Sequence, residues 1–187
     1  MTKNYPFKLR FNKNEIKELA GRHVPLDKSL DDEVVNILPS QIKARGYYTK
    51  QDLQKYCLWK SPRTKSRVAE NPTDFVEEVT RIALSTNNER LRIEVLVLLY
   101  GVNWPSASVL LHFGYEDLYP ILDFRALWSL GVERGSVPYN FDLWWVYTSY
   151  CRKIVKEAGV SMRALDLALW QYSKENQSRI KKGNHDE

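Results

Sequence analysis

Apolar residues recur at intervals of three and four positions along most of this 187-residue chain, and this periodicity constrains the fold more than any other feature. Such spacing places apolar side chains on one face of a helix, whereas a half-buried strand needs strict alternation, which no segment shows convincingly. No internal repeat is found either. The sequence therefore predicts an all-α protein, built as a compact, two-lobed helical domain. The expected helices run roughly over residues 30–38, 49–61, 71–84, 89–100, 106–113, 124–130, 141–158 and 162–174.

The composition fits one globular domain or two closely packed lobes, because 43% of the residues are apolar and 27% are charged. We expect residues 1–45 to form a lead-in packed on the body, residues 46–174 to form the main helical domain, and residues 175–187 to form a polar tail. Cys57 and Cys151 each fall in an amphipathic helix, and two cysteines are too few for a disulfide framework or an iron–sulphur cluster. No zinc-ligand cluster is found in the sequence.

The N-terminus has no apolar signal core, and no segment is apolar enough to span a bilayer. We therefore predict a cytoplasmic protein with no membrane partner. The net charge of +5 slightly favours polyanionic partners. Protein partners and the oligomeric state are not readable from the sequence.

Local signals predict where several helices begin and end. Thr49, with an acidic residue three positions later, is typical of a helix N-cap, and Pro62 should stop that helix. Pro25 and Pro39 bracket the short helix over residues 30–38. The helix over residues 89–100 should be deeply buried along one face, which carries Leu91, Val95, Leu98 and Leu99.

A tight turn between two apolar helices, residues 101–105, is the most specific local feature. Gly101 stands where a helix end favours a left-handed residue, and Pro105 suits the first position of the next helix. Free N–H groups at such a turn and at the following helix N-terminus favour a phosphate oxygen. The pattern predicts sequence-independent binding of double-stranded DNA. The expected contacts are Gly101, Val102, Asn103, Trp104 and Ser106.

A basic stretch lies between Trp59 and Arg67 and carries Lys60, Arg63 and Lys65. Charge runs are usually solvated loops, and that interpretation is the simpler one. Alternatively, these side chains contact phosphates beside a DNA cleft, provided that neighbouring elements also bind DNA. The sequence leaves both interpretations open.

Asp123 precedes a predicted helix and lies 22 residues beyond Gly101. A helix N-cap is one explanation for this aspartate. A carboxylate held rigidly near a phosphate site can also stabilise the cationic sugar that forms as a glycosidic bond breaks, or activate the attacking water. Arg125 either pairs with Asp123 and weakens it as a base, or faces a DNA phosphate.

Two segments, Leu99-Tyr100-Gly101-Val102-Asn103-Trp104-Pro105-Ser106-Ala107 and Tyr119-Pro120-Ile121-Leu122-Asp123, together carry a family resemblance. They resemble the signature of the helix-hairpin-helix DNA glycosylase superfamily, which includes endonuclease III and the adenine-specific mismatch glycosylase. The resemblance covers residues 89–131 and is weak elsewhere. It implies that Asp123 is the catalytic aspartate. It also implies that the carbonyls of the turn can hold a monovalent cation, while no other cofactor is expected.

The departures from the family pattern predict a restricted chemistry. Pro105 occupies the position of the lysine that forms a Schiff base in bifunctional members, so lyase chemistry through that position is excluded. Asn103 replaces the second glycine of the turn, and we expect it to tolerate a positive φ. The four-cysteine iron–sulphur loop is missing.

A glycosylase must also hold an extruded base, usually between aromatic or apolar faces. The chain has abundant tryptophan and tyrosine for this purpose, although aromatic residues at helical spacing are more often part of the core. Trp104 is the exception, because it lies in the turn and is expected to pack on DNA or beneath the turn. His112 is expected to be structural, and His23 and His185 fall in segments expected to be weakly ordered.

The sequence thus predicts a DNA base-excision glycosylase without lyase activity, in which Asp123 is the catalytic carboxylate. The turn and the basic residues Lys60, Arg63, Lys65 and Arg125 would bind the DNA. The alternative is a non-catalytic DNA-binding module that uses the same turn to hold phosphate. A weaker alternative is a protein-interaction module. The base that is excised cannot be predicted.

Overall fold

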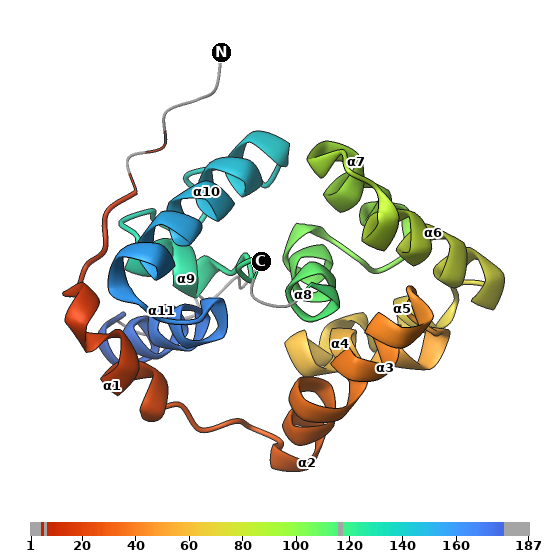
Figure 1. The fold of residues 1–187 in the computed structure, drawn as a ribbon, viewed down its shortest axis with the longest axis horizontal. Coiled ribbons are helices and arrows are strands. Elements are labelled where there is room, and N and C mark those ends of the chain that lie inside the picture. The colour runs from red at the N-terminus through yellow and green to blue at the C-terminus, as the bar shows by residue number, and fades with distance from the viewer. Residues whose placement is uncertain (1–4, 6, 116–117, 178–187) are drawn as a thin grey trace, which may run out of the picture.

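A computed structural model describes residue 5, residues 7–115 and residues 118–177, and within this part every regular element is a helix. The prediction of an all-α protein is therefore confirmed. Figure 1 shows two groups of helices with α8 near the centre, and the segment after α1 crosses from one group to the other before α2. The bounds of the N-terminal elements are η1 Lys13–Glu15, α1 Ile16–Gly21, α2 Lys28–Asp32, η2 Glu33–Ile37, α3 Leu38–Arg45, α4 Lys50–Lys60, η3 Pro62–Thr64 and α5 Lys65–Ala69. The remaining elements are α6 Thr73–Ser85, α7 Glu89–Glu94, η4 Val95–Leu98, α8 Trp104–Gly114, α9 Phe124–Ser129, α10 Phe141–Ala158 and α11 Met162–Asn176.

The first group consists of α1, α9, α10 and α11, and the second is built from α2 to α7. Helices α1 and α9 both pack on α11, so part of the predicted lead-in lies against the C-terminal helix. Helix α8 contacts α3, α4, α6 and α7. It is buried along almost its whole length, from Ser106 to Phe113. The predicted tail lies mostly outside the described residues.

The helix predicted over residues 30–38 is longer than expected, because Pro39 does not end it. Residues 28–45 form a continuous helical segment in which the π-helical turn η2 precedes Pro39 at the start of α3. Proline has no N–H to donate and clashes with the preceding turn, and a wider turn relieves both problems. The Ser40 hydroxyl donates to the Ile37 carbonyl at 2.9 Å, which satisfies one acceptor near this irregularity.

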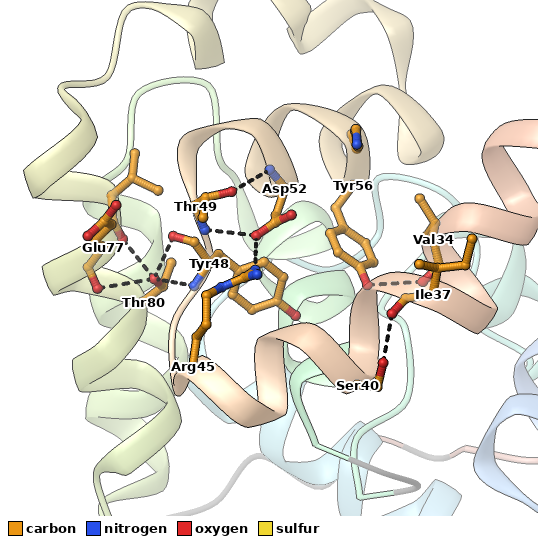
Figure 2. Close-up of polar contacts among 12 residues, drawn as sticks. Val34, Ile37, Ser40, Arg45, Tyr48, Thr49, Asp52, Tyr56, Glu77 and Thr80 are labelled. Atoms are coloured by element: carbon orange, nitrogen blue, oxygen red, sulfur yellow. Dashed lines mark hydrogen bonds and ion pairs between the residues drawn. The ribbon is translucent and has the colours of Figure 1, made fainter.

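The start of α4 is fixed as predicted, by a reciprocal cap. The Thr49 hydroxyl accepts from the Asp52 N–H at 3.2 Å, and the Asp52 carboxylate accepts from the Thr49 N–H at 2.9 Å. Arg45 of α3 forms an ion pair with the same carboxylate. Figure 2 shows these contacts beside Thr80 of α6, whose hydroxyl accepts from the Tyr48 N–H at 3.0 Å. Helices α3, α4 and α6 are therefore joined by polar contacts at this point.

The segment over residues 89–100 differs from its prediction in both shape and burial. Helix α7 tightens into the 3-10 helix η4, which ends at Leu98. The exposed fractions of Leu91 and Leu98 are 45% and 63%, whereas Ile93, Leu96 and Leu99 are buried. The tighter winding moves side chains about 20° per residue relative to an α-helix, so the buried face changes along the segment. The expected face was therefore wrong at two of its four positions.

None of the described helices is long and apolar enough to cross a bilayer. The helix over residues 141–158 has the predicted bounds, and its N-cap Asn140 accepts from the Leu143 N–H at 3.0 Å. Ser161 caps α11 in the same way, at 3.1 Å.

Candidate DNA-binding surface and pocket

The predicted turn lies between η4 and α8, and in the structure residues 99–103 form it. Gly101 has the left-handed backbone that its position predicts, with a φ of +83°. A Cβ at this position would lie 2.9 Å from the Arg67 Cβ and 3.0 Å from a Val68 methyl, so the turn packs closely on α5. Asn103 does not adopt the positive φ expected of it, since its φ is −113°. Instead it is the N-cap of α8, because its side chain accepts from the Ser106 N–H at 3.2 Å. Helix α8 starts at Trp104, one residue before Pro105.

Asn71 holds this turn in place, and nothing in the sequence singled it out. Its side chain accepts from the Tyr100 N–H at 2.8 Å and donates to the Tyr100 carbonyl at 2.9 Å. It also contacts the Val68 carbonyl at 3.0 Å. Asn71 is buried, so it fixes the turn against the end of α5 in a dry environment. Such a contact joins residues 29 positions apart and leaves no local pattern in the sequence.

We expect Asn71→Ala to lower the free energy of unfolding by about 1–3 kcal/mol, because the Tyr100 N–H and carbonyl lose their partner in a buried position. Urea denaturation followed by circular dichroism measures this change. Asn87→Ala is a matched control, since Asn87 is exposed. Equal stability of the two variants would contradict the role of Asn71 in holding the turn.

The turn presents unpaired donors. Within the part of the chain that the structure describes, the N–H groups of Gly101, Asn103 and Trp104 have no acceptor. Three free N–H groups at a helix N-terminus are suited to an anion. Trp104 is partly buried and packs against the hydrophobic core. Val102 is buried, so it is less available for contact than the sequence predicted.

The basic stretch is helical rather than a loop, and it lies beside the turn. Residues 62–64 form η3 and residues 65–69 form α5. Arg63, Lys65 and Arg67 are exposed, and the contact between α5 and Gly101 brings this segment to the same surface as the turn. The basic stretch and the turn, which no sequence pattern connects, are therefore adjacent in the structure.

The segment before Asp123, residues 119–122, is held by three buried side chains. His112 of α8 bonds through Nδ1 to the Tyr119 carbonyl at 2.7 Å, which gives it the structural role expected. The Tyr147 hydroxyl donates to the Ile121 carbonyl at 2.9 Å. The Ser108 hydroxyl accepts from the Leu122 N–H at 2.8 Å and donates to the Pro105 carbonyl at 2.7 Å. Ser108 therefore joins the start of α8 to the residue immediately before Asp123.

Asp123 caps α9, as predicted, and it also forms an ion pair that the sequence did not reveal. One carboxylate oxygen accepts from the Arg125 N–H at 2.7 Å, and the other accepts from the ammonium group of Lys60. Both side chains of this ion pair are only 14% exposed. Burial raises the pKa of the Asp123 carboxyl, but the charge and hydrogen bond of Lys60, together with Arg125, more than offset it. The pKa of Asp123 is therefore lowered and the carboxylate is ionised at neutral pH.

The Arg125 side chain forms no hydrogen bond with Asp123, although its charge helps to lower the pKa of that carboxyl. Its guanidinium lies over the rings of Phe124 and Trp170, 5.2 and 5.5 Å from the centroids. Its backbone, rather than its side chain, hydrogen-bonds Asp123.

Asp123 and Lys60 both line a pocket of about 340 Å³ between the two groups of helices. The pocket walls come from the segment between α1 and α2, from α2, from the end of α4, and from α9 and α11. Trp59 and Trp170 contribute aromatic surface. His23 lines it as well, with its ring 5.0 Å from Trp170, so this residue is part of the candidate site rather than of a weakly ordered segment. His185 lies outside the described residues.

The described part of the chain was also compared with the expectations for metal ligands and cysteines. No group of three or more His, Cys, Asp and Glu side chains there is arranged to hold a metal ion. Cys57 and Cys151 are buried and free, and burial raises the pKa of both thiols, that of Cys57 to about 12. In the turn, the Leu99 carbonyl accepts from the Val102 N–H, and the Tyr100 carbonyl accepts from the Asn71 side chain. A monovalent cation there stays a prediction.

Comparison with known proteins yields no relative. No protein-family model matches the chain, and neither does any curated protein or solved structure that was searched. The functional argument therefore depends on the geometry of the turn, of α5 and of the pocket.

Proposed function

We propose that this protein is a DNA glycosylase that hydrolyses the bond between a base and its deoxyribose, with Asp123 as the catalytic carboxylate. The observation that carries the proposal is the position of Asp123, which is ionised and rigidly capped at the wall of a pocket with two tryptophans. A pocket with aromatic surface suits a base extruded from the duplex. The resemblance over residues 89–131 supports the same activity.

Asp123 would act mainly through its negative charge. When the bond from C1′ to the base nitrogen breaks, its electron pair leaves with the base and positive charge develops on the sugar. A fixed carboxylate stabilises that charge without reorganisation, because Lys60 and the Arg125 N–H already hold it. Water then attacks C1′, and the proton that it loses balances the negative charge that the departing base carries away. The lowered pKa makes Asp123 a weak base, so charge stabilisation is the larger part of its role.

The turn and α5 would hold the duplex. The free N–H groups of the turn would bind a phosphate oxygen, while the exposed cations of η3 and α5 would contact neighbouring phosphates. These contacts do not depend on the DNA sequence. A protein that searches DNA for rare bases needs contacts of this kind.

Incubation with end-labelled duplexes, each containing one damaged or modified base, tests the proposed activity. Hot alkali then cleaves any abasic site. We expect release from at least one duplex, with strand breaks that depend on alkali, because Pro105 supplies no amine and Lys60 is held by Asp123. Breaks without alkali, together with a complex trapped by borohydride, would show instead that an amine of the protein attacks C1′. Binding without release from any duplex would favour the non-catalytic module.

Removal of charge from η3 and α5 should weaken DNA binding in a salt-dependent way. We expect Arg63→Gln, Lys65→Gln and Arg67→Gln together to reduce the slope of log K against log salt by about 2–3, since each phosphate contact contributes about 0.9. Fluorescence anisotropy with an unmodified duplex measures the slope. Lys8, Lys17 and Lys156, all changed to Gln, form the control, because all three are exposed and lie outside η3 and α5, Lys17 on α1 and Lys156 on α10. An equal effect of both triple variants would contradict a DNA surface at α5.

A further inference from the structure

Three cations and two aromatic rings alternate beside the pocket, in the first helix group. The guanidinium groups of Arg134 and Arg125 lie 4.8 and 5.2 Å from the centroid of the Phe124 ring. Arg125 also lies 5.5 Å from the centroid of the Trp170 ring, and the ammonium group of Lys174 lies 5.0 Å from that ring. We call these five residues the cation–aromatic ladder.

The first turn of α9 places the ladder next to Asp123, because Phe124 and Arg125 follow that residue directly. Trp170 and Lys174 lie one turn apart on α11, on which α9 packs. The third cation comes from the segment between α9 and α10. Since Asp123 and Trp170 both line the pocket, the ladder borders the pocket on the side of the first helix group.

None of the three cations of the ladder forms an ion pair within the part of the chain that the structure describes. The acidic residues next to them in the sequence are engaged by other cations. Glu133 pairs with Arg10 at 2.6 Å, and Glu175 pairs with Arg22 at 2.8 Å. The neighbours of the ladder therefore leave its charge in place.

The carboxylates of the pocket do not neutralise the ladder either. Those among the described residues are Asp27, Asp31, Asp123 and Asp166. Lys60 and Arg163, which also line the pocket, pair with three of them, and the fourth, Asp27, caps α2. With the three cations of the ladder, the pocket and its border carry five cations other than histidine against four carboxylates. The positive excess lies on the ladder.

Cations that share an aromatic ring repel one another, because the printed distances place them no farther apart than about one Debye length, roughly 10 Å at 0.1 M salt. The rings hold these cations by attraction to the aromatic face. The N–H groups of a guanidinium lie in its own plane, so stacking on a ring leaves them able to donate. Such an arrangement is suited to several oxygens of a polyanion.

The ladder and the basic segment of η3 and α5 lie on different sides of the pocket. Lys60 lines the pocket from the end of α4, in the second helix group, and residues 62–69 follow it directly. A DNA strand that places one nucleotide in the pocket has a phosphate on each side of that nucleotide. Cations that border the pocket from both helix groups are therefore positioned for these phosphates.

We propose that the cation–aromatic ladder binds phosphates of the DNA strand that places its nucleotide in the pocket. Arg134 and Lys174 are exposed and would contact the phosphates most directly, with the half-buried Arg125 between them. This inference deepens the proposed function and rests on it for the identity of the strand. The phosphate contacts themselves can be tested without excision.

The salt dependence of binding tests the ladder with a duplex that contains tetrahydrofuran, a stable analogue of an abasic nucleotide. We expect Arg134→Gln and Lys174→Gln together to reduce the slope of log K against log salt by about 1–2. Arg125 is left unchanged, because its backbone and charge act on Asp123. Fluorescence anisotropy measures the slope.

Lys153→Gln together with Lys156→Gln is the matched control. It removes the same charge from exposed positions on α10, which carries no member of the ladder. Thermal denaturation checks that both double variants are folded. An equal change of slope in the two double variants, or no change in either, would overturn the inference.

Neutral methylphosphonate linkages on both sides of the tetrahydrofuran locate the contact. We expect the wild-type protein to bind this modified duplex about tenfold or more weakly than the unmodified one, because charge-assisted hydrogen bonds are lost. In the variant that lacks Arg134 and Lys174, the same modification should have a much smaller effect, since the partners are already absent. Equal losses in wild type and variant would show that the ladder does not contact these phosphates.

The excision assay separates this inference from the proposed function. Base release by the wild type, with salt and methylphosphonate effects unchanged in the Arg134 and Lys174 variant, would overturn the inference and leave the glycosylase in place. Both binding effects, without release of a base from any duplex, would support the phosphate contacts of the ladder and count against the glycosylase.

Discussion

Asp123→Asn is expected to reduce base release by about 10³-fold or more, while the affinity for unmodified duplex DNA stays the same. The amide is nearly isosteric with the carboxylate and can still cap α9 at the Arg125 N–H, because Asn and Asp are comparable N-caps. What it lacks is the negative charge that stabilises the sugar cation. Single-turnover release from the best duplex substrate, measured with anisotropy on an unmodified duplex, separates the two effects.

The variant also leaves the Lys60 ammonium without its carboxylate in a site where both side chains are 14% exposed. Some loss of stability is therefore expected, and thermal denaturation must accompany the kinetics. The double variant Lys60→Met/Asp123→Asn removes the unpaired charge and provides a stable, equally inactive protein. Retained excision in either folded variant would show that Asp123 is only a helix cap.

The fold class and several helix ends follow from local sequence because the relevant contacts are local. The Thr49 cap with Asp52 spans three residues, and the Asp123 cap spans two. Gly101 adopts its left-handed conformation for the reason that its position predicts. In each case, the residue type, the spacing and the backbone conformation all support the same structure.

The errors arise where a neighbouring element determines the outcome. Pro39 normally ends a helix, but a π-helical turn accommodates it here. Leu91 and Leu98 share a helical face only if the winding stays uniform, and the change to η4 removes that condition. Asn103 was expected to replace a glycine, yet its side chain is close enough to Ser106 to cap α8.

The candidate site was only partly predictable for the same reason. Asp123 and the turn were found because the interval between them lies within one segment of the chain. The partner of Asp123 is Lys60, which is 63 residues away on a helix of the other group, and its basic neighbours gave it the appearance of a phosphate contact. His23 and Trp170 reach the pocket from opposite ends of the sequence. No periodicity or motif could have joined them.

Lys60→Met is expected to destabilise the protein by about 3–5 kcal/mol at neutral pH, because the buried Asp123 carboxylate loses its cation. The methionine fills a similar volume, so the effect reports charge rather than packing. Lys55→Met on the same helix is the matched control. Lys55 pairs with Glu33, and these side chains are 39% and 35% exposed, so the expected loss is below about 1 kcal/mol.

The pH dependence of this loss has a defined sign. In the wild type the pKa of Asp123 lies below its usual value of about 3.9, so its ionisation stabilises the fold at neutral pH and that contribution is lost as the pH falls through the lowered pKa. Without Lys60, burial is opposed only by Arg125, and the pKa of Asp123 rises. Acid then protonates the carboxyl and relieves the unpaired charge. The stability difference between wild type and variant should therefore be largest at neutral pH and shrink toward pH 4.

Catalysis should follow the same titration, since only the ionised carboxylate can stabilise the sugar cation. We expect the acid limb of the pH–rate profile to move to higher pH in Lys60→Met. Adding Asp123→Asn should recover much of the lost stability and none of the activity, so the stability effects of the two changes would not be additive. A profile unchanged by Lys60→Met, or additive losses of stability, would mean that the ion pair does not control the charge of Asp123.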